Sequence, residues 1–324
     1  MGELTYVIPV HNGAPFIGGA IRSVVHQPGR RPKIIVVDDG STDGTANVVS
    51  TFKSEVTLLQ QPNAGASAAR NLGLHAVETD IVCFVDADDY VIGPHHQGVE
   101  RSWSENVDVI VGLAAEGDDV SIRLSKNNKY SADATNYTLL CNFLRDNVVQ
   151  TSTICWSTRF LSKIGGWDEA LSVYTDIELA IRGFLQHARV AISNNPGWIV
   201  WHRHPDQMSQ KPDIRLASSQ VYSHKKLIDL IESSDAPRDI RKLFLQRCMR
   251  EGRYLYLNGF YREAVEIMSI AWNRGHTEHN GPFLESIVAN CLGTKAALST
   301  RSFLAKAKRY SARPTARGPL ARRG

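Results

Sequence analysis

The 324-residue sequence has few cysteines, and their spacing matches neither a disulfide framework nor a zinc site. The five cysteines are odd in number, and no two of them are separated by only two residues. Scattered thiols of this kind are typical of a reducing compartment, where they are expected to be buried. A structural zinc site is therefore not expected.

Long hydrophobic runs are also missing. No apolar stretch approaches the ~20 residues that a helix needs to cross a bilayer. Residues 1–10 lead straight into a strand-like segment and lack the basic and then apolar pattern of a signal peptide. We therefore expect a cytoplasmic protein.

Strong charge of one sign is absent from most of the chain. The formal net charge is +4, but residues 301–324 contain eight basic residues and no acidic one. Residues 1–300 hold 29 basic and 33 acidic residues, so nucleic acid is not an expected partner. Apolar residues make up 43% of the chain and charged residues 22%, as in ordinary soluble domains, and the length suggests two structural units.

What the sequence does contain, in its first half, is an alternation of short β-branched runs and amphipathic stretches. We expect strands at 4–10, 33–37, 56–59, 81–85 and 107–111, with helices beginning near Pro15, at a cap formed by Thr42 or Asp43, and over 66–76. This alternation predicts βαβ units and a mostly parallel sheet with helices on both faces. Asp-rich or polar turns follow the first, second and fourth strands, so a ligand site is expected at that edge.

The second half becomes helical. Further strands are expected at 153–157 and 198–201, a helix at 176–186, and then helices at 227–231, 240–249, 253–257 and 261–272. We therefore expect an α/β domain at 1–215, an α-helical domain at 216–300 and a basic tail at 301–324.

Three polar segments could carry chemistry. Asp86-Ala87-Asp88 follows a buried strand, where two carboxylates can bind a divalent cation and a diphosphate, although for this segment alone a polar turn is the favoured explanation. Residues 36–44 place more acids at a strand end, and as an isolated segment they suit a turn with a helix cap better. Residues 63–71 contain small residues that allow close helix packing, and Arg70, which could face an acidic ligand or lie on the surface.

The order and spacing of these segments resemble an inverting family 2 glycosyltransferase with the GT-A fold. The resemblance covers about residues 3–210 and rests on residues 7–12, 37–45, 63–73, 84–89, 166–171 and 174–179. It implies a nucleotide site in which Pro9, Val10 and Asn12 lie in the first loop, Asp39 or Asp38 hydrogen-bonds a uracil-type base, Arg70 lies close to that base and Asp86 approaches the ribose.

The same resemblance implies a metal and a catalytic base. Asp88 would bind Mn²⁺ or Mg²⁺ on the donor diphosphate, with His204 near the diphosphate and metal, and Asp176 matches the base. Displacement at an anomeric carbon needs the leaving diphosphate to be neutralised and the attacking hydroxyl to lose a proton to a carboxylate. Asp176 opens a predicted helix, where the macrodipole is expected to favour its ionised form.

Three residues depart from the family pattern. Thr175 precedes Asp176 where relatives usually have Glu, which could alter how the base is oriented or how the acceptor is held. His11 replaces an aromatic residue before Asn12, and His202 stands where many relatives have Arg.

The basic tail has two interpretations. Leu298, Phe303, Leu304, Ala307 and Tyr310 interleave with basic residues as in an amphipathic helix that lies on an anionic membrane surface. Residues 313–324 suit a solvated, disordered segment instead. The first interpretation would place the protein on the inner face of a membrane.

The sequence thus favours a metal-dependent inverting glycosyltransferase that uses a nucleoside-diphosphate sugar, with UDP as the expected carrier, and a glycan or lipid-linked acceptor in surface-polysaccharide or glycoconjugate synthesis. An adaptor that retains only nucleotide binding, with a helical partner-binding domain, is the alternative. A nucleotidyltransferase is less well supported, because no Gly-rich basic loop follows the first strand. The donor sugar, the acceptor, the linkage and the oligomeric state stay open.

Overall fold

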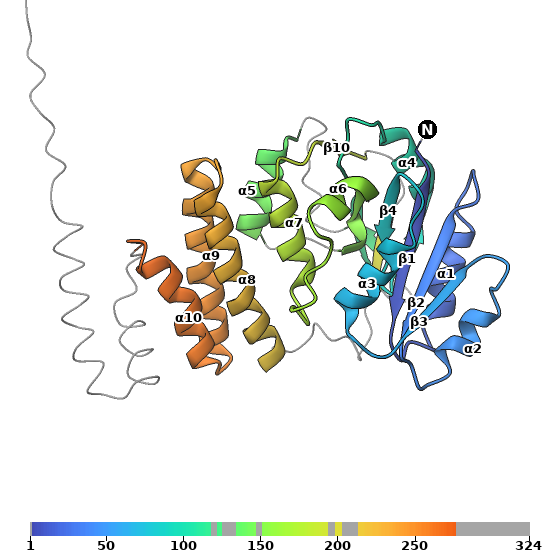
Figure 1. The fold of residues 1–324 in the computed structure, drawn as a ribbon, viewed down its shortest axis with the longest axis horizontal. Helices are drawn as coiled ribbons and strands as arrows, with labels where there is room; N and C mark the ends of the chain where they lie inside the picture. The colour runs from blue at the N-terminus through green and yellow to red at the C-terminus, as the bar shows by residue number, and fades with distance from the viewer. Residues whose placement is uncertain are drawn as a thin grey trace, which may run out of the picture. The chain divides into compact units, whose positions relative to one another are not determined.

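A computed structural model describes residues 2–117, 122–124, 134–146, 151–193, 198–202 and 213–276. The chain divides into two compact units, residues 1–247 and the residues from 248 onward. The first unit contains both β-sheets, with helices packed on the larger sheet (Figure 1).

The larger sheet has seven strands in the order β10-β6-β9-β4-β1-β2-β3. These strands are β1 (Leu4–Val10), β2 (Lys33–Asp39), β3 (Thr57–Gln61), β4 (Ile81–Phe84), β6 (Val109–Val111), β9 (Ile154–Ser157) and β10 (Val190–Ile192). The neighbours β1–β2, β1–β4, β2–β3 and β6–β10 are parallel, and β9 runs antiparallel between β4 and β6. The expected mostly parallel sheet is confirmed.

The helices of this unit are α1 (Ile17–Val25), α2 (Thr45–Ser50), α3 (Ala66–His75), α4 (His95–Ser102), α5 (Asn136–Asp146), α6 (Thr158–Lys163), α7 (Thr175–Leu185) and α8 (Ile214–Ser233), with a 3₁₀ turn at Thr151–Thr153. One expectation was wrong: α2 is capped by Gly44 in a left-handed conformation (φ 89°), not by Thr42 or Asp43. The Asp43 carboxylate instead accepts hydrogen bonds from the Thr45 N–H at 3.1 Å and the Ala14 N–H at 3.1 Å, so it links two turns.

The two faces of β1 pack against different helices. Tyr6, Ile8 and Val10 share a buried cluster with Ile17 and Ile21 of α1, whereas α3 covers the opposite face of the sheet (Figure 1). On that second face Gly73 lies so close to β1 that a Cβ added there would sit 2.4 Å from a Val7 methyl carbon. Each fully buried Ile or Val side chain contributes about 1.5–3 kcal/mol, so these contacts fix the strand edges that carry the polar loops.

A smaller sheet with the order β5-β11-β7-β8 extends this unit. Its strands are β5 (Tyr90–Ile92), β7 (Leu113–Gly117), β8 (Ile122–Leu124) and β11 (Trp198–His202). The strand at 198–201 was expected, but its pairing was not. β11 pairs antiparallel with β5 and parallel with β7, over residues far apart in the sequence.

The remaining helices are α9 (Arg238–Leu257) and α10 (Tyr261–Trp272). The helices expected at 240–249 and 253–257 form one continuous helix, α9, which begins after Pro237. Gly259, at φ 88°, ends the connection to α10. No helix among the described residues is long and apolar enough to span a membrane, and the tail at 301–324 lies outside those residues.

Candidate functional site

The polar loops after β1, β2 and β4 lie at one edge of the larger sheet. Because these three strands are parallel neighbours, their carboxyl ends point the same way, as the sequence predicts. Asn12 follows β1, Asp38 and Asp39 are the last two residues of β2, and Asp86 and Asp88 follow β4. The expected edge site is therefore assembled from segments up to about 75 residues apart.

Pro9 and Val10 do not lie in the first loop, which corrects one expectation. They are the last two residues of β1 and are buried, with Pro9 opposite Val37 of β2. Proline is tolerated in this inner strand because the pairing of β4 with β1 ends at Val7. On that side no β4 residue therefore requires a hydrogen bond from position 9, where proline has no N–H. The backbone after them, not their side chains, lines the edge.

Asp39 organises the loop that precedes α3. It is 3% exposed, and its carboxylate accepts from the Ala64 N–H at 2.8 Å, the Gly65 N–H at 2.8 Å and the Gln61 side-chain amide at 2.7 Å. Gly40 permits this arrangement, because a Cβ there would lie 2.7 Å from the Asn63 nitrogen. Asp39 therefore holds two strand-end loops together in this structure.

Asp38 and Asn12 hold the turn between β2 and α2. The Asp38 side chain is buried and accepts from the Ser41 N–H at 3.0 Å and the Gln60 amide at 3.2 Å. Asn12 adopts a positive φ of 51°, and its side-chain oxygen accepts from the Thr42 N–H at 2.8 Å. These contacts join the first and second loops into one surface.

Arg70, on α3, connects two parts of the site. Its Nη2 donates to the Asp86 carboxylate at 2.7 Å, and its Nη1 lies 3.4 Å from the Thr175 hydroxyl. The guanidinium stacks on Trp167, 4.5 Å from the ring centre, which keeps it 7% exposed. Thr175 thus contacts the same guanidinium that pairs with Asp86.

Asp176 is the second residue of α7 and is half-buried. Burial raises the pKa of its carboxyl to about 6, and the nearby negative charge of Asp86 raises the pKa further, while the Ile177 N–H and the positive charge of Arg70 lower it. The helix start does favour the ionised form through the Ile177 N–H, but the cost of removing the carboxylate from water is larger, so the net effect is a raised pKa.

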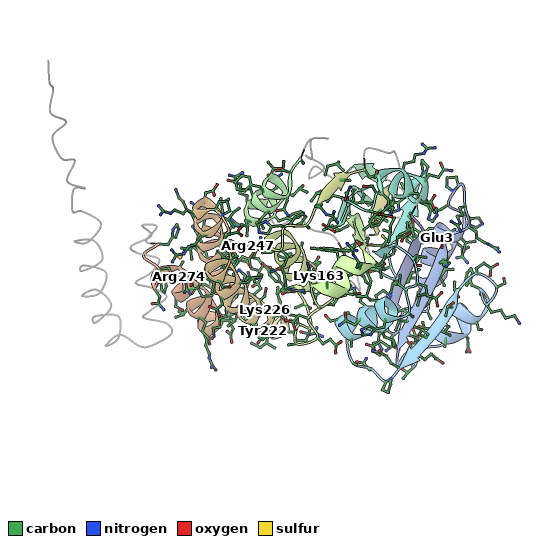
Figure 2. The ribbon with its side chains drawn as sticks, turned by 45° about the horizontal axis from the view of Figure 1, so that its top comes forward. Glu3, Lys163, Tyr222, Lys226, Arg247 and Arg274 are labelled. Atoms are coloured by element: carbon green, nitrogen blue, oxygen red, sulfur yellow. The ribbon has the colours of Figure 1, made fainter. Side chains whose placement is uncertain are left out.

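A buried ion network, which the sequence did not reveal, fixes α7 beside this cluster. Glu178, fully buried, pairs with Arg182 at 2.8 Å and with Lys226 of α8 at 2.9 Å, and Lys226, labelled in Figure 2, also pairs with Asp168. Arg182 donates to the carbonyl oxygens of Ile164 and Gly166. Asp168, in the Gly-Trp-Asp-Glu segment, and Glu178, in α7, thus have structural roles. The i, i+4 spacing of Glu178 and Arg182 is the one sequence feature that indicates this network.

Tyr174 caps α7 directly before Thr175 and Asp176. It adopts a left-handed conformation (φ 68°), which is costly for an aromatic residue. Its hydroxyl accepts from Nε of Arg247 at 3.0 Å, and the fully buried Arg247 also donates to the Phe143 carbonyl at 2.6 Å (Figure 2). Nothing in the local sequence indicates this contact, because it joins positions 73 residues apart.

Asp86 and Asp88 present oxygen ligands of the kind that Mn²⁺ and Mg²⁺ prefer. Both side chains are half-buried at the end of β4. Within the described residues no third acid, His or Cys gathers with them into a ligand group, which suits a cation that takes its other ligands from substrate phosphates and water. His204, the other expected metal neighbour, lies outside the described residues.

Residues 5–162 match the model of the family described as glycosyl transferase family 2. Curated relatives agree: glycosyltransferase GlyA of Streptococcus pneumoniae is 35% identical over 114 residues, covering 34% of this chain and 16% of the relative. An uncharacterized glycosyltransferase of Rickettsia prowazekii, RP339, is 27% identical over 187 residues, covering 56% of this chain and 58% of the relative. The matches thus span less than two thirds of these relatives' lengths.

Two solved structures with a similar fold hold nucleotide sugars. S. aureus TarS 1–349 in complex with UDP-GlcNAc has a TM-score of 0.66 at 18% identity, covering 89% of this chain and 81% of TarS 1–349. The mannosyltransferase PcManGT of Pyrobaculum calidifontis, in complex with GDP-Man and Mn²⁺, has a TM-score of 0.57 at 19% identity, covering 96% of this chain and 82% of PcManGT.

Proposed function

We propose that this chain, whose residues 5–162 match the glycosyl transferase family 2 model, transfers a sugar from a UDP-linked donor to an acceptor hydroxyl with inversion of the anomeric centre. The observation that carries the proposal is the Asp176 carboxyl, whose pKa is raised to about 6 beside Arg70 and Asp86. A general base works best when its pKa lies near the working pH. An ordinary Asp, with a pKa near 3.8, would be a weaker base.

In the proposed reaction Asp176 takes the proton from the acceptor hydroxyl as that oxygen attacks the anomeric carbon. The bond from that carbon to the diphosphate oxygen breaks in the same step, so a single displacement inverts the centre. Arg70 has two roles: it keeps the Asp176 pKa from rising further, and it orients Asp86 through their 2.7 Å ion pair. Both roles depend on the buried position of the guanidinium over Trp167.

We place the nucleotide along the loops after β1, β2 and β4. Asp39 and Asp38 would support the base, although their carboxylates already bind loop amides, so their contribution is chiefly to hold the loop that faces it. Asn12 shapes the neighbouring turn, and Asp86 would approach the ribose. UDP is favoured because the resemblance implies a uracil-type base and TarS, with the same fold, binds UDP-GlcNAc.

We propose Asp88 as the principal ligand of a divalent cation, Mn²⁺ or Mg²⁺, with His204 as a further neighbour. Bound to the diphosphate, such a cation supplies neutralisation of the charge that develops on the leaving group. Asp88 is suited to hold it because its carboxylate follows β4 at the same edge as the nucleotide loops. PcManGT, which shares the fold, is solved with Mn²⁺ and GDP-Man.

The acceptor is proposed to be a glycan or lipid-linked hydroxyl compound in surface-polysaccharide or glycoconjugate assembly. The basic tail at 301–324 would hold the otherwise cytoplasmic protein on an anionic membrane surface, close to such an acceptor. This part of the proposal rests on the charge and apolar pattern of the tail alone.

The test is a screen of UDP- and GDP-sugars with Mn²⁺, scored by release of the nucleoside diphosphate without acceptor and by transfer to glycan and lipid-linked acceptors. We expect turnover with at least one UDP-sugar, and a loss of roughly 10²–10⁴-fold in the D176N variant, the usual contribution of a general base. D235N is the matched control, because Asp235 is an exposed Asp paired only with His187 at 2.9 Å, and it should keep wild-type turnover.

Two results would contradict the proposal. Near-wild-type turnover by D176N would remove Asp176 as the base. UDP binding with no hydrolysis or transfer for any donor would instead favour the adaptor, in which the nucleotide site is retained without chemistry.

A further inference from the structure

Beneath the nucleotide edge, three potential metal ligands meet in the core. Cys83 comes from β4, Cys155 from β9, and His95 is the first residue of α4. They are 0%, 2% and 4% exposed, and each offers one ligand atom within 4.8 Å of the others. Among the described residues this is the one group of three or more His, Cys, Asp or Glu side chains that gathers in this way.

The sheet itself brings the two thiols together. Cys83 and Cys155 are direct partners in the antiparallel ladder between β4 and β9, so their side chains project from the same face. Both belong to the cluster that also contains Tyr6. The sequence spacing of 72 residues conceals this pair, which is why cysteine spacing predicted no metal site.

His95 is held in an orientation that suits a ligand. Its Nδ1 lies 2.9 Å from the Tyr6 hydroxyl oxygen, a hydrogen bond that leaves Nε2 with its lone pair when Nδ1 carries the proton. Metal-binding histidines commonly use their second nitrogen in this way. Gly112 borders this nitrogen, since a Cβ at that position would lie 3.9 Å from Nε2, an ordinary van der Waals contact.

We propose that Cys83, His95 and Cys155 bind one thiophilic d¹⁰ cation, Cu⁺ or Zn²⁺. Two thiolates and an imidazole are ligands that such cations prefer, whereas Mn²⁺ and Mg²⁺ prefer oxygen, so this site is distinct from the carboxylates after β4. Three ligands in a buried setting satisfy Cu⁺, while Zn²⁺ usually takes a fourth. Binding releases each thiol proton to solvent, and no oxidation is involved.

The thiol acidities are compatible with this role. Hydrogen bonding with Cys83 lowers the pKa of Cys155, against the effect of burial. The same bond with Cys155, together with burial, raises the pKa of Cys83. A bound cation would favour loss of both thiol protons, because its positive charge stabilises the thiolates.

The test uses the full-length protein, kept reduced, with excess Mg²⁺ to occupy the carboxylate site. In one arm Cu⁺ is presented as its bicinchoninate complex, and in the other Zn²⁺ competes with a chromophoric chelator. We expect the protein to take up one equivalent of cation in at least one arm, and the bound cation to raise the melting temperature. The cation that binds more tightly is the one that the site prefers.

The variants separate the site from general thiol binding. C155A should no longer take up one equivalent of cation, because its affinity for the cation is weakened by at least 100-fold. C141A, which removes a buried cysteine of α5, should still bind one equivalent. Y6F retains the ring but not the hydroxyl next to His95, and should weaken binding by about 10–100-fold if C155A does not fold. No stoichiometric uptake in either arm, or equal uptake by wild type and the C155A or Y6F variant, would overturn the proposal.

Discussion

The Arg70 guanidinium pairs with the Asp86 carboxylate at 2.7 Å while the positive charge of Arg70 lowers the pKa of Asp176. Asp86 acts on Asp176 in the opposite direction, since its negative charge raises that pKa. Arg70 therefore counters the effects of burial and of Asp86 on the proposed base. Removing Arg70 would both delete a nearby cation and leave the Asp86 charge less compensated.

The pH dependence of activity should reveal this relationship. We expect wild-type kcat/KM to rise with pH and to level off above about 6, because Asp176 must lose its proton to act as a base. In R70Q the pKa of Asp176 rises, so the increase of kcat/KM should occur at higher pH. R189Q, which disrupts the Arg189–Asp108 pair beside β6, is the control and should leave the pH of this increase unchanged. An unchanged pH profile in R70Q would contradict the assignment of Asp176 as the base.

Replacing Asp176 by Asn should raise the free energy of unfolding although it lowers activity. Its folded pKa lies above the unfolded value, so the ionised carboxylate costs stability, a cost that appears as pH rises from about 4 to about 6 and persists above. D176N removes this cost. We expect it to be more stable than wild type at pH 7 by on the order of 1–2 kcal/mol, and nearly equal at pH 4, by urea unfolding. A stability difference that is independent of pH would count against a raised pKa.

Asp39 should prove to be a structural residue as well as part of the proposed nucleotide site. D39A leaves the part-buried Ala64 and Gly65 N–H groups without their acceptor, which should lower the free energy of unfolding by about 1–3 kcal/mol. D80A is a suitable comparison, because Asp80 accepts one exposed N–H, from Glu3 at 3.1 Å, and its loss should cost less than about 1 kcal/mol. Equal stabilities of the two variants in urea titrations would refute this role.

Metal dependence provides a separate test of Asp88. Chelation should abolish turnover, and added Mn²⁺ should restore it in wild type but not in D88A. Isothermal titration should show weaker Mn²⁺ binding by D88A in the presence of UDP, while D235A binds as wild type does. Full restoration of D88A by Mn²⁺ would show that another residue holds the cation.

The hydroxyl of Tyr174 should matter for the rate more than for donor binding. Y174F keeps the ring at the start of α7 but loses the hydrogen bond from Arg247, so Thr175 and Asp176 are held less firmly. We expect kcat to fall about tenfold with the donor KM unchanged, since small displacements of a catalytic group are costly. Y254F alters an exposed tyrosine of α9 and should leave both constants unchanged. A rise in KM alone would indicate a role in donor binding instead.

Much of the fold was predictable because its signals are local. The β-branched runs around Tyr6 and Val36 and the turn-forming residues after them mark strands and their ends without reference to distant contacts. Once these strands are parallel neighbours, Asn12, Asp39 and Asp86 must share one edge. The helical boundaries were less accurate where a glycine conformation decides them, as at Gly44.

The sequence by itself therefore determined the parallel α/β framework, the edge that carries the polar loops and the family resemblance, because each depends on short-range pattern and strand order. Three features depend on the tertiary structure alone. They are the raised pKa of Asp176, the hydrogen bond from Arg247 to the Tyr174 hydroxyl, and the pairing of Cys83 with Cys155 across β4 and β9. Burial is set by all the atoms packed around a group, and register by the pairing of distant strands, so neither can be obtained from the residues adjacent in the chain.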